Sequence, residues 1–222
     1  MSLAGRVETP KSQPIPIREG GFGGVGGLAK FLTDGGFTHV IDATHPFAAQ
    51  MSRNAVEACA TADISLVALT REAWVAQSGD RWTNVPSIDA AAAMLDQSSR
   101  RILLAIGRMH LDSFSGNPQH FYMLRLVDQP AVQLPFPSYE IIVARGPFSY
   151  VDDLALLREN QIDLVVSKNS GGTGARAKID AARTLGIEVL MIDRPNLPAR
   201  TEVHSVDEVM DWITSHDADR GV

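Results

Sequence analysis

The sequence predicts an α/β fold made of two Rossmann-like domains, whose parallel sheets face a central cleft. Short strands rich in Val, Ile and Leu alternate with helical segments along all 222 residues, which is typical of parallel sheets flanked by helices. The order of elements also repeats, since Gly21 and Gly146 are 125 positions apart, and so are Asp42 and Ser167. The repeat favours a duplication with a ligand between two similar domains, although βα units also resemble one another by chance.

The first half begins with a short strand, a Pro-rich link and a Gly-rich turn. A helix is predicted after Pro46, because Met51, Ala55 and Cys59 recur on one side at helical spacing. The neighbouring strands are continuous apolar runs, as expected for buried parallel strands. The strands expected here are residues 2–3, 39–43, 64–71 and 81–85, and the helices are residues 27–32, 48–60 and 88–95.

The second half follows the same plan and closes with a helix whose apolar face holds Val209, Trp212 and Ile213. We expect the domain boundary in the polar stretch 97–100, which gives domains of residues 1–99 and 100–222. The strands expected in this half are residues 101–107, 121–127, 140–146, 162–167, 188–195 and 201–205, and the helices are residues 110–114, 151–160, 175–186 and 206–213.

The two halves differ at their beginnings. The second half opens with a strand and a short helix, residues 101–114, for which the first half has no counterpart. A Rossmann-type domain normally begins with a strand, a Gly-rich turn and a helix. We therefore expect the first domain to lack its first βα unit, through natural variation, truncation or misannotation of the start.

Composition and charge exclude several classes of protein. A formal net charge of -6 argues against binding of nucleic acid. Cys59 is the one cysteine, so no intrachain disulfide can form, which fits a reducing compartment and predicts a cytoplasmic location. No apolar run is long enough to span a bilayer. The histidines lack the spacing of a zinc site, and no metal is expected.

Three polar side chains follow the strand that ends in Val40 and Ile41. Asp42, Thr44 and His45 leave this strand together, and ligands of open α/β sheets bind beyond the carboxyl ends of strands. His45 could donate a hydrogen bond or a proton near neutral pH, and Asp42 could orient it or a ribose hydroxyl. Alternatively, Asp42 and Thr44 cap the following helix, a role that is compatible with ligand contact.

Two further segments of the first half are candidates for a phosphate site. If Ser2 and Leu3 close a strand, the next residues form the turn where dinucleotide folds read the adenosine ribose, and an Arg there suits a 2′-phosphate. The Gly-rich run 20–27 could let a phosphate approach the following helix. The alternatives are a frayed terminus and a flexible loop. The candidates are Ser2, Leu3, Ala4, Gly5, Arg6, Gly21, Phe22, Gly23 and Gly24.

The second half carries a polar loop in the matching place. A lysine supplies positive charge there, an asparagine and a serine supply hydrogen bonds, and two glycines admit a ligand, which suits a substrate that bears carboxylates. A plain turn explains the glycines but leaves the lysine unexplained. The candidates are Lys168, Asn169, Ser170, Gly171 and Gly172, together with the Gly146-Pro147-Phe148 turn.

These segments resemble the precorrin-6A reductase family of cobalamin biosynthesis. The resemblance extends from Ser2 to about Trp212, and the order and spacing of its segments make it specific. The matching segments are SLAGR, GGFGG with GL after two further residues, IDATHPFA with MSRNA, TREAW, the strand ending in IGR, LVD, GPF, SKNSGG, AAR-LGI and MIDRP.

The resemblance implies an NADPH-dependent oxidoreductase that transfers a hydride to the macrocycle of precorrin-6A, or of its cobalt form. It implies that SLAGR, GGFGG, Asp42, Thr44 and His45 face NADPH in the first domain. It also implies that the GPF turn and KNSGG face the tetrapyrrole substrate in the second. We expect His45 to be the proton donor, with solvent or a substrate carboxylate as the alternative. Other enzymes of the corrin pathway are the expected protein partners, without nucleic acid or membrane.

The chain departs from the family at one point. Family members begin with an apolar strand and a Gly-Gly-Thr turn before the SLAGR segment, and that unit would supply the centre of the sheet and part of the pyrophosphate site. Without it we expect weak NADPH binding and low stability. Two rival readings are a non-catalytic two-domain ligand-binding protein and a truncated reductase with impaired activity. A nucleotide-sugar transferase has no motif in its favour beyond the architecture.

Overall fold

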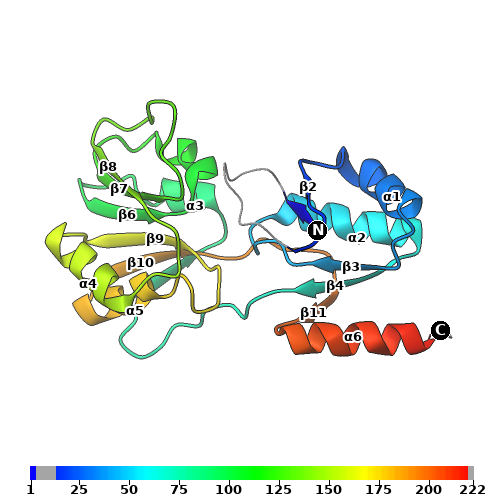
Figure 1. Cartoon of the computed structure of the whole chain (residues 1–222). Helices are drawn as coiled ribbons and strands as arrows, with labels where there is room; N and C mark the ends of the chain where they lie inside the picture. Colours follow the sequence, from blue (N-terminus) through cyan, green and yellow to red (C-terminus); the bar gives the residue numbers. More distant parts are fainter. Residues whose placement is uncertain (4–13, 220–222) are drawn as a thin grey trace. The chain divides into compact units, whose positions relative to one another are not determined.

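The computed structural model describes residues 1–3 and 14–219, which form two compact units (Figure 1). Unit 1 comprises residues 1–72 and 196–222, and unit 2 comprises residues 73–195. Among the described residues every strand pairing is parallel, and helices alternate with the strands. The predicted α/β class with parallel sheets is therefore confirmed, and the cleft between two domains stays a prediction.

Unit 2 is built on one six-stranded sheet with the strand order β5-β10-β9-β6-β7-β8. Its strands are β5 (Trp82–Val85), β6 (Arg101–Ala105), β7 (Phe121–Leu126), β8 (Tyr139–Val143), β9 (Leu164–Lys168) and β10 (Glu188–Ile192). Its helices are α3 (Ile88–Ala93), η1 (Arg108–His110), η2 (Asp112–Phe114), α4 (Tyr150–Glu159) and α5 (Ala177–Leu185). Leu103, Val165 and Met191 from three central strands have no exposed surface, and Leu157 of α4 and Ile179 of α5 pack on the same cluster.

Unit 1 carries a three-stranded sheet of order β11-β4-β3 and a separate pair, β1 with β2. Its strands are β1 (Ser2–Leu3), β2 (Arg18–Glu19), β3 (His39–Asp42), β4 (Ser65–Leu69) and β11 (Thr201–Val203), and its helices are α1 (Gly24–Asp34), α2 (Ala49–Ala62) and α6 (Val206–Asp219). Leu28 and Leu32 of α1 pack with Ala58 and Cys59 of α2. Because the α2 side chains in this contact are small, the two helices can pack closely.

The sheet of each unit includes one strand that, in the sequence, comes directly after a strand of the other unit. β5 comes after β4 of unit 1, yet it pairs with β10 of unit 2. Conversely, β11 comes after β10, yet it pairs with β4. The boundary expected at residues 97–100 therefore differs from the observed division, in which the chain crosses near residues 72 and 196. Apolar patterning locates a strand but does not say which sheet edge the strand joins.

The elements of the two units correspond except at one place. β1, β2, β3 and β4 correspond in order to β7, β8, β9 and β10. In unit 2, β6 lies between β9 and β7 and joins them into one sheet. In the described part of unit 1 no strand occupies that position, and the sheet is interrupted between β3 and β1. The short helix expected near residues 110–114 is present as two 3₁₀ turns, η1 and η2.

Candidate functional site

The loop after β3 is organised around the buried carboxylate of Asp42. Its Oδ1 accepts hydrogen bonds from the backbone N–H of Thr44 (3.1 Å) and from Thr44 Oγ1 (2.7 Å). Its Oδ2 accepts from Ser52 Oγ (2.7 Å) and from Arg200 Nη1 (2.6 Å). Both carboxylate oxygens are thus used within the protein, so Asp42 shapes the loop. A direct contact between Asp42 and a ribose stays a prediction.

Electrostatics keep this carboxylate ionised at neutral pH. Burial alone would raise the pKa of Asp42, but hydrogen bonds from Thr44 and Ser52 and the charge of Arg200 outweigh it and hold this pKa below its usual value. The expected capping of α2 by Asp42 or Thr44 does not occur, because the N-cap is Ala48 and no side chain caps the helix. Pro46 and Phe47 form a turn that separates the two residues from the helix.

His45 is exposed at the tip of the same loop. Its Nδ1 accepts a hydrogen bond from the backbone N–H of Phe47 (3.2 Å), and the two rings lie with centroids 5.9 Å apart. A nitrogen that accepts this bond carries no proton, so the neutral ring holds its proton on Nε2. The geometry leaves Nε2 as the atom that could deliver a proton to a ligand.

The Gly-rich loop is held by Arg18, which sequence reasoning did not identify. Its guanidinium donates to the carbonyls of Gly20 and Gly21, both at 2.8 Å, and stacks on the ring of Phe22, 4.2 Å from the centroid. Gly27 allows the loop to fold back on α1, since a Cβ there would lie 1.8 Å from the carbonyl oxygen of Phe22. Phe22 therefore packs as part of the loop's support.

The ends of β1 and β2 bring two predicted segments together. Ser2 pairs in register with Arg18 and Leu3 with Glu19, so the two parallel strands end at the same edge, where the Gly-rich loop follows β2. Ala4, Gly5 and Arg6 lie outside the described residues. Around Gly21, Gly23 and Gly24 no atom lies within 4 Å of the position that a Cβ would take, so this loop offers open backbone to a ligand.

The loop after β9 is fixed to a neighbouring segment by Asn169. Its side chain accepts from the backbone N–H of Trp74 (2.8 Å) and donates to the carbonyl of Trp74 (2.9 Å). Asn169 is 7% exposed, and both its amide oxygen and its amide nitrogen take part in this pair, so it holds the loop. Its direct contact with a substrate stays a prediction. Ser170 is also buried, whereas Lys168 is half-buried at the end of β9.

The Gly146-Pro147-Phe148 turn contacts Gly174, which lies two residues beyond the predicted segment 168–172 in the same loop. The backbone N–H of Phe148 donates to the carbonyl of Gly174 (3.2 Å), and Gly146 lies so close to that carbonyl that a Cβ would meet it at 3.1 Å. The Gly146–Pro147 peptide bond is cis. The glycines at 171 and 172 both have positive φ values, 68° and 69°, a conformation that other residues rarely adopt.

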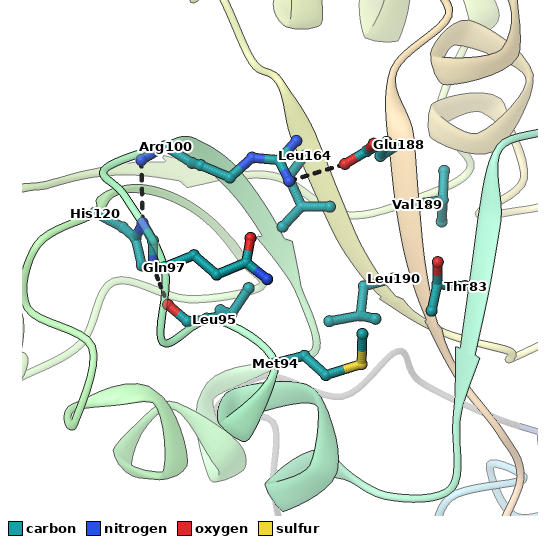
Figure 2. A pocket seen from close by; sticks show the side chains of 10 residues that line it. All are labelled: Thr83, Met94, Leu95, Gln97, Arg100, His120, Leu164, Glu188, Val189 and Leu190. Atoms are coloured by element: carbon teal, nitrogen blue, oxygen red, sulfur yellow. Dashed lines mark hydrogen bonds and ion pairs between the residues drawn. The ribbon is translucent and has the colours of Figure 1, made fainter.

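Unit 2 also contains a cavity of about 260 Å³ at the amino ends of its strands (Figure 2). Arg100 and Glu188 form an ion pair at its rim (2.8 Å). His120 accepts from the backbone N–H of Arg100 (3.1 Å) and donates through Nε2 to the carbonyl of Leu95 (2.7 Å). These groups satisfy one another, and the predicted site residues lie at the carboxyl ends of the strands. The cavity is therefore not part of the candidate site.

Comparison with known proteins identifies the family. The profile of the precorrin-6x reductase CbiJ/CobK family matches residues 1–214. The chain belongs to this family. This confirms the resemblance found from the motifs. Within the described residues, no helix could cross a membrane and no group of three or more His, Cys, Asp or Glu side chains could hold a metal ion.

Several precorrin-6x reductases cover nearly the whole chain. The precorrin-6A reductase of Rhodobacter capsulatus is 54% identical over 100% of this chain and 88% of its own length. The precorrin-6A reductase of Mycobacterium tuberculosis is 41% identical over 96% of this chain and 86% of its own length. The cobalt-precorrin-6A reductase of Priestia megaterium is 30% identical over 82% of this chain and 75% of its own length.

A solved structure of the precorrin-6x reductase family has the same fold. It is described as CobK precorrin-6A reductase, superposes with a TM-score of 0.93 and is 54% identical in sequence. The match covers 97% of this chain and 86% of that chain. Both the family and the fold of this chain are therefore established.

Four residues that support the site were missed by sequence reasoning. Arg18 binds the loop that directly follows it, whereas Trp74 and Arg200 act on loops that are distant from them in sequence. Lys178 is buried beneath the loop after β9. A single lysine in a helix does not by itself indicate burial. The position of Lys178 on an otherwise apolar face of α5 is nevertheless a signal from which its burial could have been predicted.

Proposed function

We propose that this chain reduces precorrin-6A by hydride transfer from NADPH in cobalamin biosynthesis. The observation that carries the proposal is the 54% identity, over the whole chain, to a relative named precorrin-6A reductase. Relatives named cobalt-precorrin-6A reductase are at most 31% identical among those compared. The difference favours the cobalt-free tetrapyrrole as the substrate.

Unit 1 is the proposed cofactor unit. The backbone around Gly23 and Gly24 is open, and α1 begins there without a side-chain cap and without an acidic residue in its first turn. The N–H groups at such a helix start attract a phosphate. The residues present therefore fit a nicotinamide dinucleotide, with Arg6 as the proposed contact of the 2′-phosphate that distinguishes NADPH. When bound, this cofactor supplies the hydride from the nicotinamide ring.

Unit 2 is the proposed substrate unit. Lys168 supplies a cation at the end of β9, and the loop of residues 171–175 offers backbone N–H groups beside it. The Gly146-Pro147-Phe148 turn is bonded to the same loop and would border the macrocycle. Carboxylates of a tetrapyrrole are recognised by this combination of cation and backbone donors.

His45 is the proposed proton donor, because hydride addition to a double bond must be completed by a proton. Its ring lies at an exposed position, and the donor would be the imidazolium, which gives up its Nε2 proton and becomes the neutral ring. Positioning of the two reactants accounts for most of the expected rate enhancement, and the proton donor for the rest. We place the reaction in the cytoplasm, where the pool of NADPH is available. Interactions with other corrin-pathway enzymes stay a prediction.

Turnover tests the proposal directly. We expect oxidation of NADPH, followed at 340 nm, with precorrin-6A and much less with its cobalt form. His45→Ala should lower kcat by about 10² to 10⁴-fold if His45 delivers the proton. A change confined to the KM for NADPH would make His45 a binding residue only. Binding of both ligands without any oxidation would favour the rival reading, a non-catalytic ligand-binding protein.

A further inference from the structure

The loop that follows β9 is held from beneath by donors that grip its carbonyl oxygens. Trp74 Nε1 donates to the carbonyl of Gly172 (2.7 Å), and Lys178 Nζ donates to the carbonyl of Ala175 (2.6 Å). The Nζ of Lys178 also lies 5.0 Å from the centroid of the Trp74 ring, a cation–π distance. One buried ammonium therefore holds both the loop and the tryptophan that supports it.

The carbonyl oxygens of this loop are hydrogen-bonded, whereas its backbone N–H groups remain available to a ligand. Within the described residues, the backbone N–H groups of residues 171–175 donate no hydrogen bond to another backbone group. Gly171 and Gly172 have φ values of 68° and 69°, and successive N–H groups in such left-handed turns form a concave site for an anion. With its carbonyls held inward, the loop is suited to receive a carboxylate on its outer side.

The charges beneath the loop do not cancel. Arg125 of β7 and Asp153 of α4 form an ion pair whose side chains are 8% and 3% exposed. Lys178 of α5 is 4% exposed and adds a second cation to this group. Arg125 also stacks on Phe148, 4.5 Å from the ring centroid, and its Nε has no hydrogen-bond partner in the described structure. A protonated Lys178 leaves one positive charge in excess.

We propose that Lys178 is a positioning residue for the substrate: its buried ammonium fixes the 171–175 loop and supplies the excess positive charge that attracts a substrate carboxylate to the loop's N–H groups. This inference rests on the proposed function and deepens it, because it names a carboxylate as the substrate group that this loop receives. Lys178 is 4% exposed and acts through the loop, so it is not a catalytic residue.

The protonation state of Lys178 makes the inference testable. Burial first, and then the charge of Arg125, lower the pKa of Lys178 to about 7, while Asp153 opposes this shift. The charged groups that act on Lys178 are thus Arg125 from β7 and Asp153 from α4. The Arg176 and Asp180 side chains of its own segment pair with each other. The ammonium is expected to lose its proton between about pH 6 and pH 8.5.

The experiment measures the dissociation constant of precorrin-6A without cofactor, by absorbance titration at pH 6 and pH 8.5. Wild-type protein is expected to bind about tenfold more weakly at pH 8.5, because one nearby charge is lost. Lys178→Met should bind weakly at both pH values, and Lys178→Arg tightly at both. The affinity for NADPH, which we assign to unit 1, should be the same in all three proteins and serves as the control.

A second readout separates this role from simple loss of folding. Trp74 fluorescence should titrate with pH in the wild type and not in Lys178→Met, and thermal unfolding should show that both variants are folded. If affinity for the tetrapyrrole shows the same pH dependence in wild type and Lys178→Met, the inference is wrong. If the wild type neither binds nor reduces precorrin-6A while the fluorescence titration remains, the proposed function fails instead.

Discussion

β3 of unit 1 and β9 of unit 2 occupy matching places, yet their surroundings differ. Val166 in β9 lies between Leu104 of β6 and Leu190 of β10 and has no exposed surface. Ile41 at the matching position of β3 pairs, among the described residues, only with Val67 of β4 and is 44% exposed. Two strands of similar composition are thus a central strand in one unit and an edge strand in the other.

The difference teaches that the two units obtain their stability in different ways. Unit 2 has one continuous sheet with a buried hydrophobic core, and burial of apolar surface is the main favourable contribution to folding. Unit 1 has a sheet edge at β3 and relies more on α1 packed with α2 and on the ion pair of Asp42 with Arg200. Edge strands with exposed apolar side chains are also sites of unwanted pairing.

The largest expected effect compares the buried ion pairs of the units. Asp153→Ala should lower the free energy of unfolding by about 3–5 kcal/mol, because Arg125 is left buried without a partner. Asp42→Ala should cost less, since Arg200 keeps a second partner in Glu202 (3.1 Å). Urea unfolding measures both, with the exposed Asp152→Ala as control. Equal losses in the two variants would contradict the comparison.

The two matching strands give the next effect. Val166→Ala removes fully buried methyl groups and should cost about 2 kcal/mol of unfolding free energy. Ile41→Ala at the half-exposed position should cost less than about 1 kcal/mol, because that side chain gains little on folding. The measurement is the urea midpoint of each variant. If Ile41→Ala were the more damaging change, β3 would have to be covered in solution.

A smaller effect concerns the Gly-rich loop of unit 1. Gly27→Ala places a Cβ 1.8 Å from the carbonyl oxygen of Phe22, so the loop must move, and the affinity for NADPH should fall by about tenfold. Gly26→Ala is the matched control, because no atom lies within 4 Å of its Cβ, and alanine favours the helix. Binding is measured by calorimetry. If Gly27→Ala weakened the binding of precorrin-6A but not that of NADPH, the assignment of this loop to the cofactor would be wrong.

The last effect is a pH dependence of stability that has the same sign in both units but lies in a different pH range in each. The pKa of Asp42 is below its ordinary value in the folded protein, so its contribution to stability is present above about pH 4 and is lost as the pH falls through the folded value. The pKa of Lys178 is about 7 in the folded protein against 10.5 when unfolded. The unfolded state therefore binds more protons between these values, and stability rises with pH across that window.

Asp42→Asn should remove the pH dependence of the unfolding free energy on the acid side. Lys178→Met should remove the pH dependence between about pH 7 and pH 10. Chemical unfolding at a series of pH values checks both. A profile of Lys178→Met that still rises between pH 7 and pH 10 with the wild-type slope would show that Lys178 is not the group concerned.

Local elements were predictable from the sequence, and long-range choices were not. The strand that ends in Asp42 and the helix 48–60 follow from apolar spacing, which is a local property. The exchange of β5 and β11 depends on which sheet edge offers the better core: Val85 and Val203 are each buried in the unit that does not contain the preceding strand of the sequence. Patterning does not contain that information.

The site shows the same limit. The motifs located the loops after β2, β3, β8 and β9, because polar residues and glycines there interrupt apolar runs. They did not distinguish side chains that face a ligand from those that hold the loop. Asn169 binds the backbone of Trp74, and Asp42 binds Arg200, a residue 158 positions away. Such partners are set by the tertiary fold.

Amide hydrogen exchange, measured with each ligand in turn, tests most directly whether NADPH binds unit 1 and precorrin-6A binds unit 2. The account predicts that NADPH slows exchange in residues 20–27 and 43–47 of unit 1, and that precorrin-6A slows exchange in residues 146–148 and 169–175 of unit 2. Protection of residues 169–175 by NADPH, or of residues 20–27 by precorrin-6A, would contradict it.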